Sequence, residues 1–244
     1  MKSVNKVVVI GDGDLGIRIG DLFNKAGLPV FIDSKVSNTD ELADADMVIE
    51  ATSGEADLRR ETLRRCDEKI QQDAILATTA SSGITELAVL TQKPSRFTGL
   101  HFTFNPFQDG CLVEIVKGLD TSVETVAACA DLLTSVGAKT VATVDSAGLV
   151  LDRVMALAIN EAVIMHATGV ASIEYIDRVA KSCLNWPAGP FEFADIIGID
   201  RVLSTLELLS HEVGPRFLPC RLLRQMVAMG KLGRKTGKGF YTYS

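Results

Sequence analysis

The first 145 residues alternate short runs of aliphatic and β-branched residues with stretches of helical periodicity. The runs that we expect to form strands are 6–10, 29–33, 47–51, 74–78, 97–103, 112–116 and 140–144. Helical spacing lies between several of them, at 14–26, 56–71 and 121–136. Parallel strands need crossover connections, and these are usually helices. The alternation of strands and helices therefore predicts a mainly parallel sheet with helices on both faces.

The pattern changes after residues 145–149, a short connector of small residues with the sequence DSAGL. From there to the end the spacing of apolar residues is helical, and glycines and prolines punctuate it. We therefore predict an α/β domain over residues 1–145 and an all-α domain over residues 146–244.

Charge and cysteine usage exclude several classes of protein. The 244-residue chain has a net charge of -6 and no dense basic patch, which disfavours nucleic-acid binding. The longest apolar stretch contains four polar residues, so it predicts a half-buried helix and no membrane span; these are Asp152, Arg153, Asn160 and Glu161. The start of the chain does not resemble a signal peptide, and five cysteines in no metal-ligand pattern favour a reducing compartment. We expect a cytoplasmic protein without a metal site.

A glycine-rich turn follows the first apolar run, in the sequence VVVIGDGDLG. Gly11, Gly13 and Gly16 have the spacing G-x-G-x-x-G. The first glycine of that pattern permits a tight turn, the second lets the backbone approach a pyrophosphate, and the third lets a helix pack on a strand. The phosphates meet free N–H groups at the start of the helix. The turn predicts a Rossmann-type dinucleotide site that includes Asp14 and Leu15.

The second apolar run ends at Asp33, about twenty residues beyond the glycines, where a carboxylate accepts hydrogen bonds from an adenosine ribose. The same carboxylate repels a 2′-phosphate, so it favours NAD over NADP. The alternative is a turn that binds nothing. A carboxylate of Asp12 or Asp14 that faced the loop would oppose a pyrophosphate, unless it points outward or Asp14 caps the helix.

His101 is one of three histidines, and the turn-forming residues NPFQDG (105–110) separate it from Glu114. A hairpin with its midpoint near Phe107 and Gln108 places His101 opposite Glu114. A carboxylate beside a histidine fixes one tautomer and stabilises the imidazolium, as a general base requires. A purely structural pair is the alternative, and it is the more common case.

Eight segments, in order along essentially the whole chain, resemble the L-3-hydroxyacyl-CoA dehydrogenase family. They are VVVIGDGDLG, ADMVIEAT, AILATTASSGITEL, RFTGLHFTFNP, LVEIVKG, LVLDRVMALAINEA, WPAGPFEFADIIGID and GKLGRKTGKGFYTY. The resemblance implies an NAD-binding first domain, a helical second domain that forms homodimers, and an active site between them. It also implies oxidation of the 3-hydroxyl of an acyl thioester, or reduction of the 3-keto form.

The resemblance also implies roles for particular residues. His101 resembles the catalytic base and Glu114 its partner. Ser81 matches a serine that contacts substrate and cofactor, and Asn105 matches the asparagine of the family's His-Phe-Phe-Asn-Pro run. Two further matches concern the cofactor: Arg59 stands where the family usually has a cofactor-contacting lysine, and Lys235 matches another such lysine.

Three departures from the family pattern bear on these roles. Thr103 is an additional residue between His101 and Asn105, and either a β-bulge absorbs it or one of the two side chains points away. Asp152 replaces an asparagine that helps to position the substrate carbonyl, and an ionised aspartate offers acceptors alone; a helix residue paired with Arg153 or solvent is the alternative. Twelve residues separate Asp33 from Asp46, where the family commonly inserts a helical hairpin that contributes to the CoA site.

We expect an NAD-dependent oxidoreductase of fatty acid metabolism that acts on a short-chain 3-hydroxyacyl-CoA such as 3-hydroxybutyryl-CoA. Two alternatives stay open. One is a dehydrogenase of a free hydroxy acid without CoA, and the other is a homologue that binds NAD and catalyses nothing. We also expect a homodimer formed through the second domain, where apolar stripes in 201–213 and 220–232 form either its interface or an internal core face.

Overall fold

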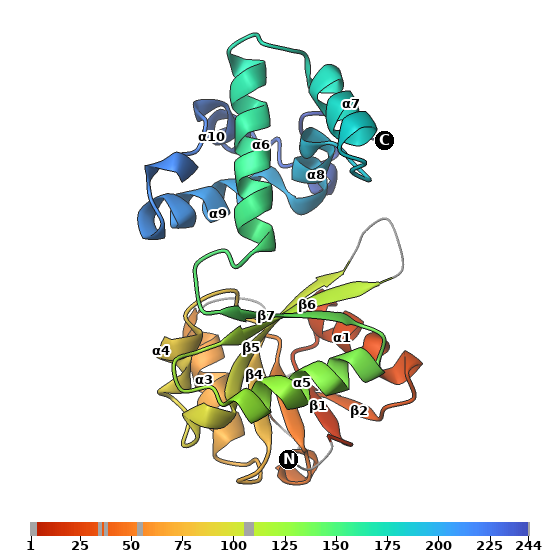
Figure 1. Cartoon of the computed structure of the whole chain (residues 1–244), viewed down its shortest axis with the longest axis vertical. Helices are drawn as coiled ribbons and strands as arrows, with labels where there is room; N and C mark the ends of the chain where they lie inside the picture. Colours follow the sequence, from red (N-terminus) through yellow and green to blue (C-terminus); the bar gives the residue numbers. More distant parts are fainter. Residues whose placement is uncertain (1–3, 34–35, 37–38, 53–55, 105–109, 244) are drawn as a thin grey trace. The chain divides into compact units, whose positions relative to one another are not determined.

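The computed structural model describes residues 4–33, 36, 39–52, 56–104 and 110–243 (Figure 1). The chain forms two compact units, Met1–Leu149 and Val150–Ser244. The first unit holds all of the β-strands, and the second consists of helices and turns over its described residues.

A seven-stranded sheet in the order β2-β1-β3-β4-β5-β6-β7 is the centre of the first unit. Its strands are β1 (Val7–Ile10), β2 (Val30–Asp33), β3 (Met47–Glu50), β4 (Ile75–Thr78), β5 (Phe97–Phe104), β6 (Cys111–Lys117) and β7 (Lys139–Val144). Neighbouring strands run parallel except β5 and β6, which are antiparallel. The mainly parallel, Rossmann-type sheet expected from the sequence is confirmed.

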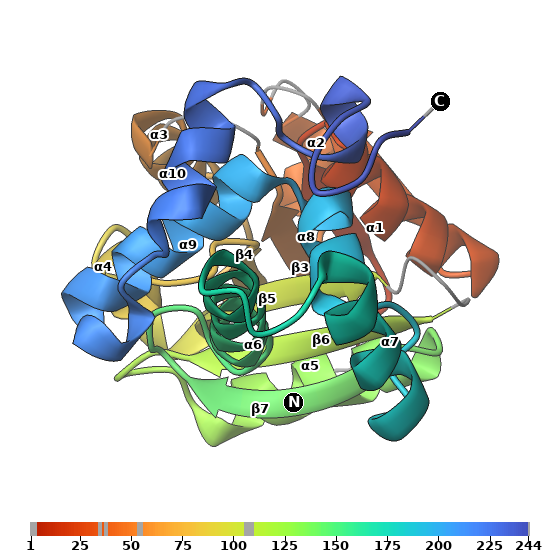
Figure 2. The ribbon, with the colours of Figure 1, turned by 90° about the horizontal axis from the view of Figure 1, so that it is seen from above.

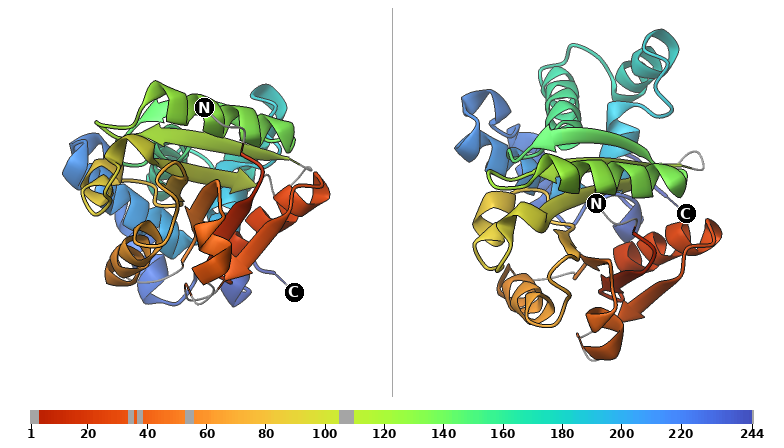
Figure 3. Two further views of the ribbon diagram at one scale, coloured as in Figure 1. Left: turned by 90° about the horizontal axis from the view of Figure 1, so that it is seen from below. Right: turned by 60° about the horizontal axis from the view of Figure 1, so that its bottom comes forward.

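Helices cover both faces of this sheet. Apolar residues of α1 (Asp14–Lys25) and α5 (Val123–Ser135) form one core with one face, and Figure 3 shows α5 lying along that face. Residues of α2 (Thr39–Ala43), α3 (Ala56–Asp67) and α4 (Ile84–Ala88) form a second core with the other face. Burial on both sides explains why β1, β3 and β4 are apolar at nearly every position rather than at alternate positions.

Over its described residues, the second unit contains five α-helices (Figures 1 and 2) and the short 3₁₀ helices η2 (Pro215–Phe217) and η3 (Arg234–Thr236). The α-helices are α6 (Leu151–Ala167), α7 (Ile173–Cys183), α8 (Pro190–Ile197), α9 (Ile199–Glu212) and α10 (Arg221–Ala228). The long helix α6 packs against α8, α9 and α10. The apolar stripe of α9 faces this core, because Val202, Leu206 and Leu209 are buried, as are Leu223 and Met226 of α10. These five residues of the two stripes thus belong to an internal core face.

The end of the chain is a non-helical tail, whereas the sequence pattern indicated helix throughout this unit. Asp195 accepts hydrogen bonds from the backbone N–H groups of Phe240 and Tyr241, both at 2.9 Å, and from the Tyr243 hydroxyl. Asp177 accepts a hydrogen bond from the Tyr241 hydroxyl at 2.9 Å. Both carboxylates are buried. These bonds satisfy two buried acids and attach the tail to α7 and α8 at the same time.

No helix among the described residues is long and apolar enough to cross a membrane.

Candidate active site

The glycine-rich turn leads from β1 into α1 and requires glycine at two positions. Gly11 has a φ of +134°, and a Cβ atom there would collide with the backbone of Ala51. A Cβ atom on Gly16 would overlap the carbonyl oxygen of Gly11, so helix α1 approaches the turn more closely than any other residue permits. Gly13 is the N-cap residue of α1 and has an extended conformation. Gly11 and Gly16 thus provide the tight turn and the close helix packing that the dinucleotide-binding pattern requires.

The two aspartates of this turn, Asp12 and Asp14, are both exposed. Asp14 is the first residue of α1 and does not cap it. The N-cap residue is Gly13, which has no side chain to accept a hydrogen bond from the helix. Asp33 ends β2 beside the turn, where its carbonyl oxygen accepts a 2.8 Å hydrogen bond from the N–H of Gly11. The side chain of Asp33 is buried.

The imidazole of His101 is paired with the carboxylate of Glu114. The two residues lie directly opposite each other on β5 and β6, and Nδ1 of His101 is 3.0 Å from Oε2 of Glu114. Both are buried, at 8% and 1% exposure. This hydrogen bond assigns the proton to Nδ1 and leaves Nε2 as the basic atom. Nε2 has no hydrogen-bond partner in the described part of the chain. The predicted juxtaposition of His101 and Glu114 is confirmed.

The additional residue Thr103 lies inside a regular ladder. Thr103 pairs with Leu112 and Phe104 with Cys111, so no β-bulge interrupts the pairing from Gly99 to Phe104. Of the two alternatives, a β-bulge that absorbs Thr103 is therefore not found over these residues. The side chains of His101 and Thr103 therefore share one face of the sheet. Asn105 lies outside the described residues.

Ser81 lies on the chain that leaves β4, the strand that pairs with the His101 strand β5. The last residue of β4, Thr78, pairs with Gly99 of β5, and His101 follows two residues beyond Gly99. The strands are parallel, so the chain after Thr78 passes the same edge of the sheet that His101 reaches. Ser81 is partly exposed, and its hydroxyl forms no hydrogen bond within the described part of the chain.

Glu50, at the end of β3, is a fully buried carboxylate that the sequence analysis did not single out. Its Oε2 atom accepts hydrogen bonds from the Thr78 hydroxyl at 2.5 Å and from Nε of Arg59 at 3.2 Å. Its Oε1 atom accepts from the backbone N–H and the hydroxyl of Thr52. Arg59 also donates from Nη2 to the carbonyl oxygen of Thr52. The signal in the sequence was an acid that ends an otherwise apolar strand.

Asp145, at the end of β7, is another residue that the sequence analysis missed. It accepts hydrogen bonds from the backbone N–H groups of Gly83 and Thr85. No local pattern pointed to it, because its partners are sixty or more positions away along the chain.

Two predicted site residues lie in the second unit. Lys235 forms an ion pair with Asp200, with Nζ and Oδ2 2.6 Å apart. Asp152 lies in the first turn of α6 and is partly exposed. It forms no hydrogen bond or ion pair with the residues that the structure describes.

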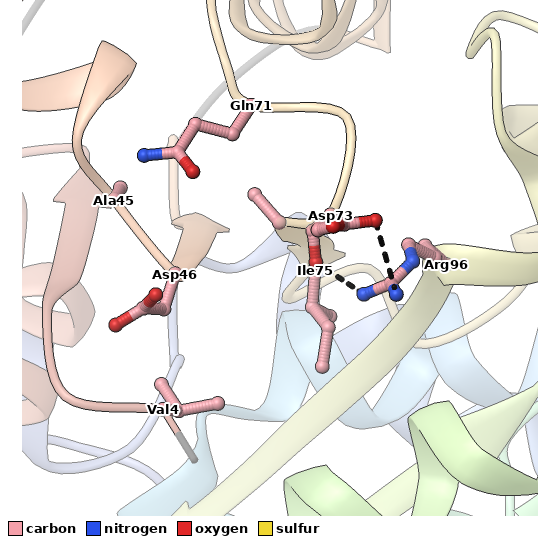
Figure 4. A pocket seen from close by; sticks show the side chains of 8 residues that line it. Val4, Ala45, Asp46, Gln71, Asp73, Ile75 and Arg96 are labelled. Carbon is pink, nitrogen blue, oxygen red and sulfur yellow. Dashed lines mark hydrogen bonds and ion pairs between the residues drawn. The ribbon is translucent and has the colours of Figure 1, made fainter. Parts of the chain in front are cut away.

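A surface pocket lies at the opposite edge of the sheet, where β1, β3 and β4 begin (Figure 4). Its charged groups are engaged in the protein's own structure: Asp46 accepts from the N–H groups of Asn5 and Lys6, and Arg96 binds Asp73. The glycine turn and Ser81 follow the carboxyl ends of β1 and β4, where nucleotides bind to parallel sheets, and His101 lies on β5 beyond the row in which β4 ends. This pocket is therefore separate from the candidate active site.

Cys111 begins β6 close to the hairpin turn, and it is buried. Burial raises the pKa of its thiol to about 11. A thiol with so high a pKa is a weak nucleophile at neutral pH, and Cys111 acts as a small packing residue. Over the described residues, no cluster of three His, Cys, Asp or Glu side chains is arranged to hold a metal ion.

The chain matches both domains of one enzyme family. Residues 34–146 match the NAD binding domain of 3-hydroxyacyl-CoA dehydrogenase, and residues 148–243 match its C-terminal domain. The match to the first of these domains confirms NAD as the predicted cofactor.

Individual relatives agree with this match. A 3-hydroxybutyryl-CoA dehydrogenase of Clostridioides difficile is 39% identical over 213 residues, which cover 86% of this chain and 75% of that protein. A probable 3-hydroxybutyryl-CoA dehydrogenase of Bacillus subtilis is 41% identical over 211 residues, covering 85% and 73%. The crystal structure of (S)-3-hydroxybutyryl-CoA dehydrogenase from Ralstonia eutropha superposes with a TM-score of 0.92 at 34% identity, covering 99% of this chain and 100% of that one. The chain therefore belongs to the 3-hydroxyacyl-CoA dehydrogenase family.

Proposed function

We propose that the protein transfers a hydride between NAD and the 3-hydroxyl or 3-keto group of a short-chain 3-hydroxyacyl-CoA, such as 3-hydroxybutyryl-CoA. The observation that carries the proposal is the buried pair of His101 and Glu114 on β5 and β6, beyond the row in which the parallel strand β4 ends. The names of the relatives from C. difficile and B. subtilis support this substrate. The pathway that we propose is fatty acid metabolism.

The turn of Gly11, Gly13 and Gly16 would hold the pyrophosphate of NAD, with backbone N–H groups at the start of α1, including those of Asp14 and Leu15. Two observations support the fit: the φ of Gly11, and the space that a Cβ atom on Gly16 would fill. Asp33 would accept hydrogen bonds from the adenosine ribose. When bound, NAD supplies the acceptor or donor of the hydride.

His101 acts as the general base in oxidation and as the general acid in reduction. Its Nε2 atom takes the proton of the 3-hydroxyl, and Glu114 stabilises the imidazolium through Nδ1. The burial of both residues strengthens this interaction by keeping water away from it. Ser81 donates a hydrogen bond that positions the substrate oxygen, and Asn105 is proposed to assist it.

Arg59 and Lys235 are proposed cofactor contacts, and each has an acidic partner in the structure. Arg59 binds Glu50 through Nε and Thr52 through Nη2, so the contact that we propose uses Nη1. Lys235 has to leave Asp200 to contact a cofactor. For this reason we expect a replacement of Asp200 to change the affinity for NADH if the role of Lys235 is correct.

Replacement of His101 by glutamine tests the proposal. We expect His101→Gln to lower kcat for acetoacetyl-CoA by about 10²- to 10⁴-fold and to leave the Kd for NADH unchanged. His211→Gln is the matched control, because His211 is exposed and pairs with Glu212 in the second unit. Equal kcat values for His101→Gln and the unmodified protein would contradict the proposal. Tight NADH binding without turnover on any substrate would instead favour a homologue that binds NAD and catalyses nothing.

A free hydroxy acid is the second candidate substrate. The observation that favours it is the short connection between β2 and β3, which contains the five-residue helix α2. The ratio of kcat/KM for acetoacetyl-CoA to that for free acetoacetate separates the two candidates. A ratio well above one supports the CoA ester, and a ratio below one supports the free acid.

We also propose that the protein is a cytoplasmic homodimer formed through its second unit. All five cysteines are free thiols, which suits a reducing compartment. Val154, Leu218 and Met229 are large apolar side chains of the second unit that remain exposed. Light scattering on the purified protein measures the mass of the particle, and a monomer at micromolar concentration would contradict the dimer.

A further inference from the structure

The segment that carries Ser81 is attached to the rest of the first unit on both sides. On the β4 side, the N–H of Thr79 donates to the carbonyl oxygen of Glu50 at 2.9 Å, and the N–H of Ala80 donates to the Thr78 hydroxyl at 3.2 Å. These bonds fix the chain up to the residue before Ser81.

On the α4 side, the attachment is a single carboxylate from a distant part of the sequence. Oδ1 of Asp145 accepts the N–H of Gly83 at 3.1 Å, and Oδ2 accepts the N–H of Thr85 at 2.8 Å. Asp145 is itself held at the end of the sheet, because its own N–H donates to the carbonyl oxygen of Lys117 at 3.0 Å.

The reason for this long-range contact lies in Gly83. Gly83 is the N-cap residue of α4 and has a left-handed conformation, with a φ of 72°. A glycine has no side chain to accept the first N–H groups of a helix, so Asp145 replaces the missing cap. Both bonds join an N–H group to a carboxylate, and such charge-assisted bonds are stronger than neutral ones.

Between the two attachments, the hydroxyl groups of Ser81 and Ser82 form no hydrogen bonds with the described residues. The position of Ser81 is therefore set by its neighbours rather than by a bond of its own. We propose that Asp145 is a positioning residue, which holds the Ser81 hydroxyl in place for the substrate. This inference rests on the proposed role of Ser81 in substrate binding.

The competing explanation is that Asp145 merely stabilises the fold. Asp46 provides a matched control, because its carboxylate also accepts two backbone N–H groups from a distant segment, those of Asn5 and Lys6. Asp46 precedes β3 and lines the pocket of Figure 4, and its partners Asn5 and Lys6 precede β1, away from the segment of Ser81. A purely structural acid lowers the melting temperature without a specific effect on turnover.

The test is a double-mutant cycle with Ser81→Ala, Asp145→Ala and the combined variant, measured as kcat and KM for acetoacetyl-CoA with saturating NADH. We expect Asp145→Ala to lower kcat by about 10- to 100-fold, since a displacement of about 1 Å in a positioned group has effects of this size. The Kd for NADH stays the same. In the Ser81→Ala background, Asp145→Ala lowers kcat by less than about twofold, because the hydroxyl group that Asp145 positions is already absent. Asp46→Ala leaves kcat unchanged.

Independent, multiplicative effects of the two substitutions would overturn the inference, and so would an unchanged kcat in Asp145→Ala. If Asp145→Ala does not fold, Asp145→Asn enters the same cycle, since its amide retains one acceptor and presents a donor to the second N–H group. An unchanged kcat in Ser81→Ala would reject both the proposed role of Ser81 and this inference. The proposed function is tested independently by His101→Gln.

Discussion

Nδ1 of His101 lies 3.0 Å from Oε2 of Glu114, across the antiparallel pair of β5 and β6. The two are thirteen positions apart in sequence, and backbone pairing of the strands brings them together. Both are buried, so water does not compete for the bond. The pair leaves Nε2 as the one ring atom able to exchange a proton with a ligand.

Replacement of Glu114 by glutamine tests this relationship. Glutamine keeps the size of the side chain and an acceptor oxygen, but it has no charge to stabilise an imidazolium. We expect Glu114→Gln to lower kcat for acetoacetyl-CoA by about 10- to 100-fold, with the Kd for NADH unchanged. In a His101→Gln background the same change should have little further effect. A full additional loss there would mean that Glu114 does not act through His101.

Asp33 should decide between NAD and NADP. A carboxylate at the end of β2 repels a 2′-phosphate, and Asp33→Ser removes that charge. We expect the ratio of kcat/KM for NADPH to that for NADH to rise by about tenfold or more, which corresponds to about 1.4 kcal/mol. Steady-state kinetics with both cofactors measure the ratio. An unchanged ratio would exclude Asp33 from the cofactor site.

Two acids of the second unit should give opposite dependences of stability on pH. Burial raises the pKa of Asp177, and the hydrogen bonds that it accepts from Phe191, Tyr241 and Glu192 oppose this effect without cancelling it. The folded protein then holds the proton more tightly than the unfolded chain. The contribution of Asp177 to the free energy of unfolding is greatest below the pKa of the unfolded chain and is lost as the pH rises through the pKa of the folded protein.

Asp200 is the contrasting case. Burial alone would raise its pKa, but the hydrogen bond and charge of Lys235 outweigh burial and lower it. Its contribution is present above the pKa of the unfolded chain and is lost as the pH falls through the pKa of the folded protein. Urea unfolding of Asp177→Asn and Asp200→Asn at pH values from about 3 to 7 measures both differences from the unmodified protein. Slopes of the same sign would contradict the assignment.

Cysteine reactivity should report the packing of the first unit. Cys183 is exposed, whereas Cys66 and Cys129 are buried, and burial raises the pKa of each of these two thiols to about 12. We expect a thiol reagent such as Ellman's reagent to modify Cys183 rapidly, and Cys66 and Cys129 only after unfolding. Peptide mapping after a short exposure identifies the modified residues. Rapid labelling of Cys66 in the folded protein would contradict the packing of α3 on the sheet.

Sequence patterns with a short range were enough to predict the strands, the glycine turn and the pairing of His101 with Glu114. Continuous apolar runs report strands buried on both faces, and a hairpin constrains which residues lie opposite each other. The sequence left open whether a β-bulge absorbs Thr103, and only the pairing of the two strands shows a regular ladder from Gly99 to Phe104. The helical reading of the last residues was wrong because Asp177 and Asp195 hold the tail in another conformation.

The amino-acid sequence by itself determined the class of fold, the family and the turn for the dinucleotide, because residues close together in the sequence indicate each of these. Only the tertiary structure decided the surroundings of Ser81. Glu50 ends β3, which is parallel to β4, whereas Asp145 follows β7, which runs in the opposite direction to both. The order of the strands in the sheet brings both residues to the segment of Ser81, although they are far from it in the chain. Contacts of this kind depend on which strands become neighbours. The order of the strands depends on the packing of the whole unit, and no local sequence pattern indicates it.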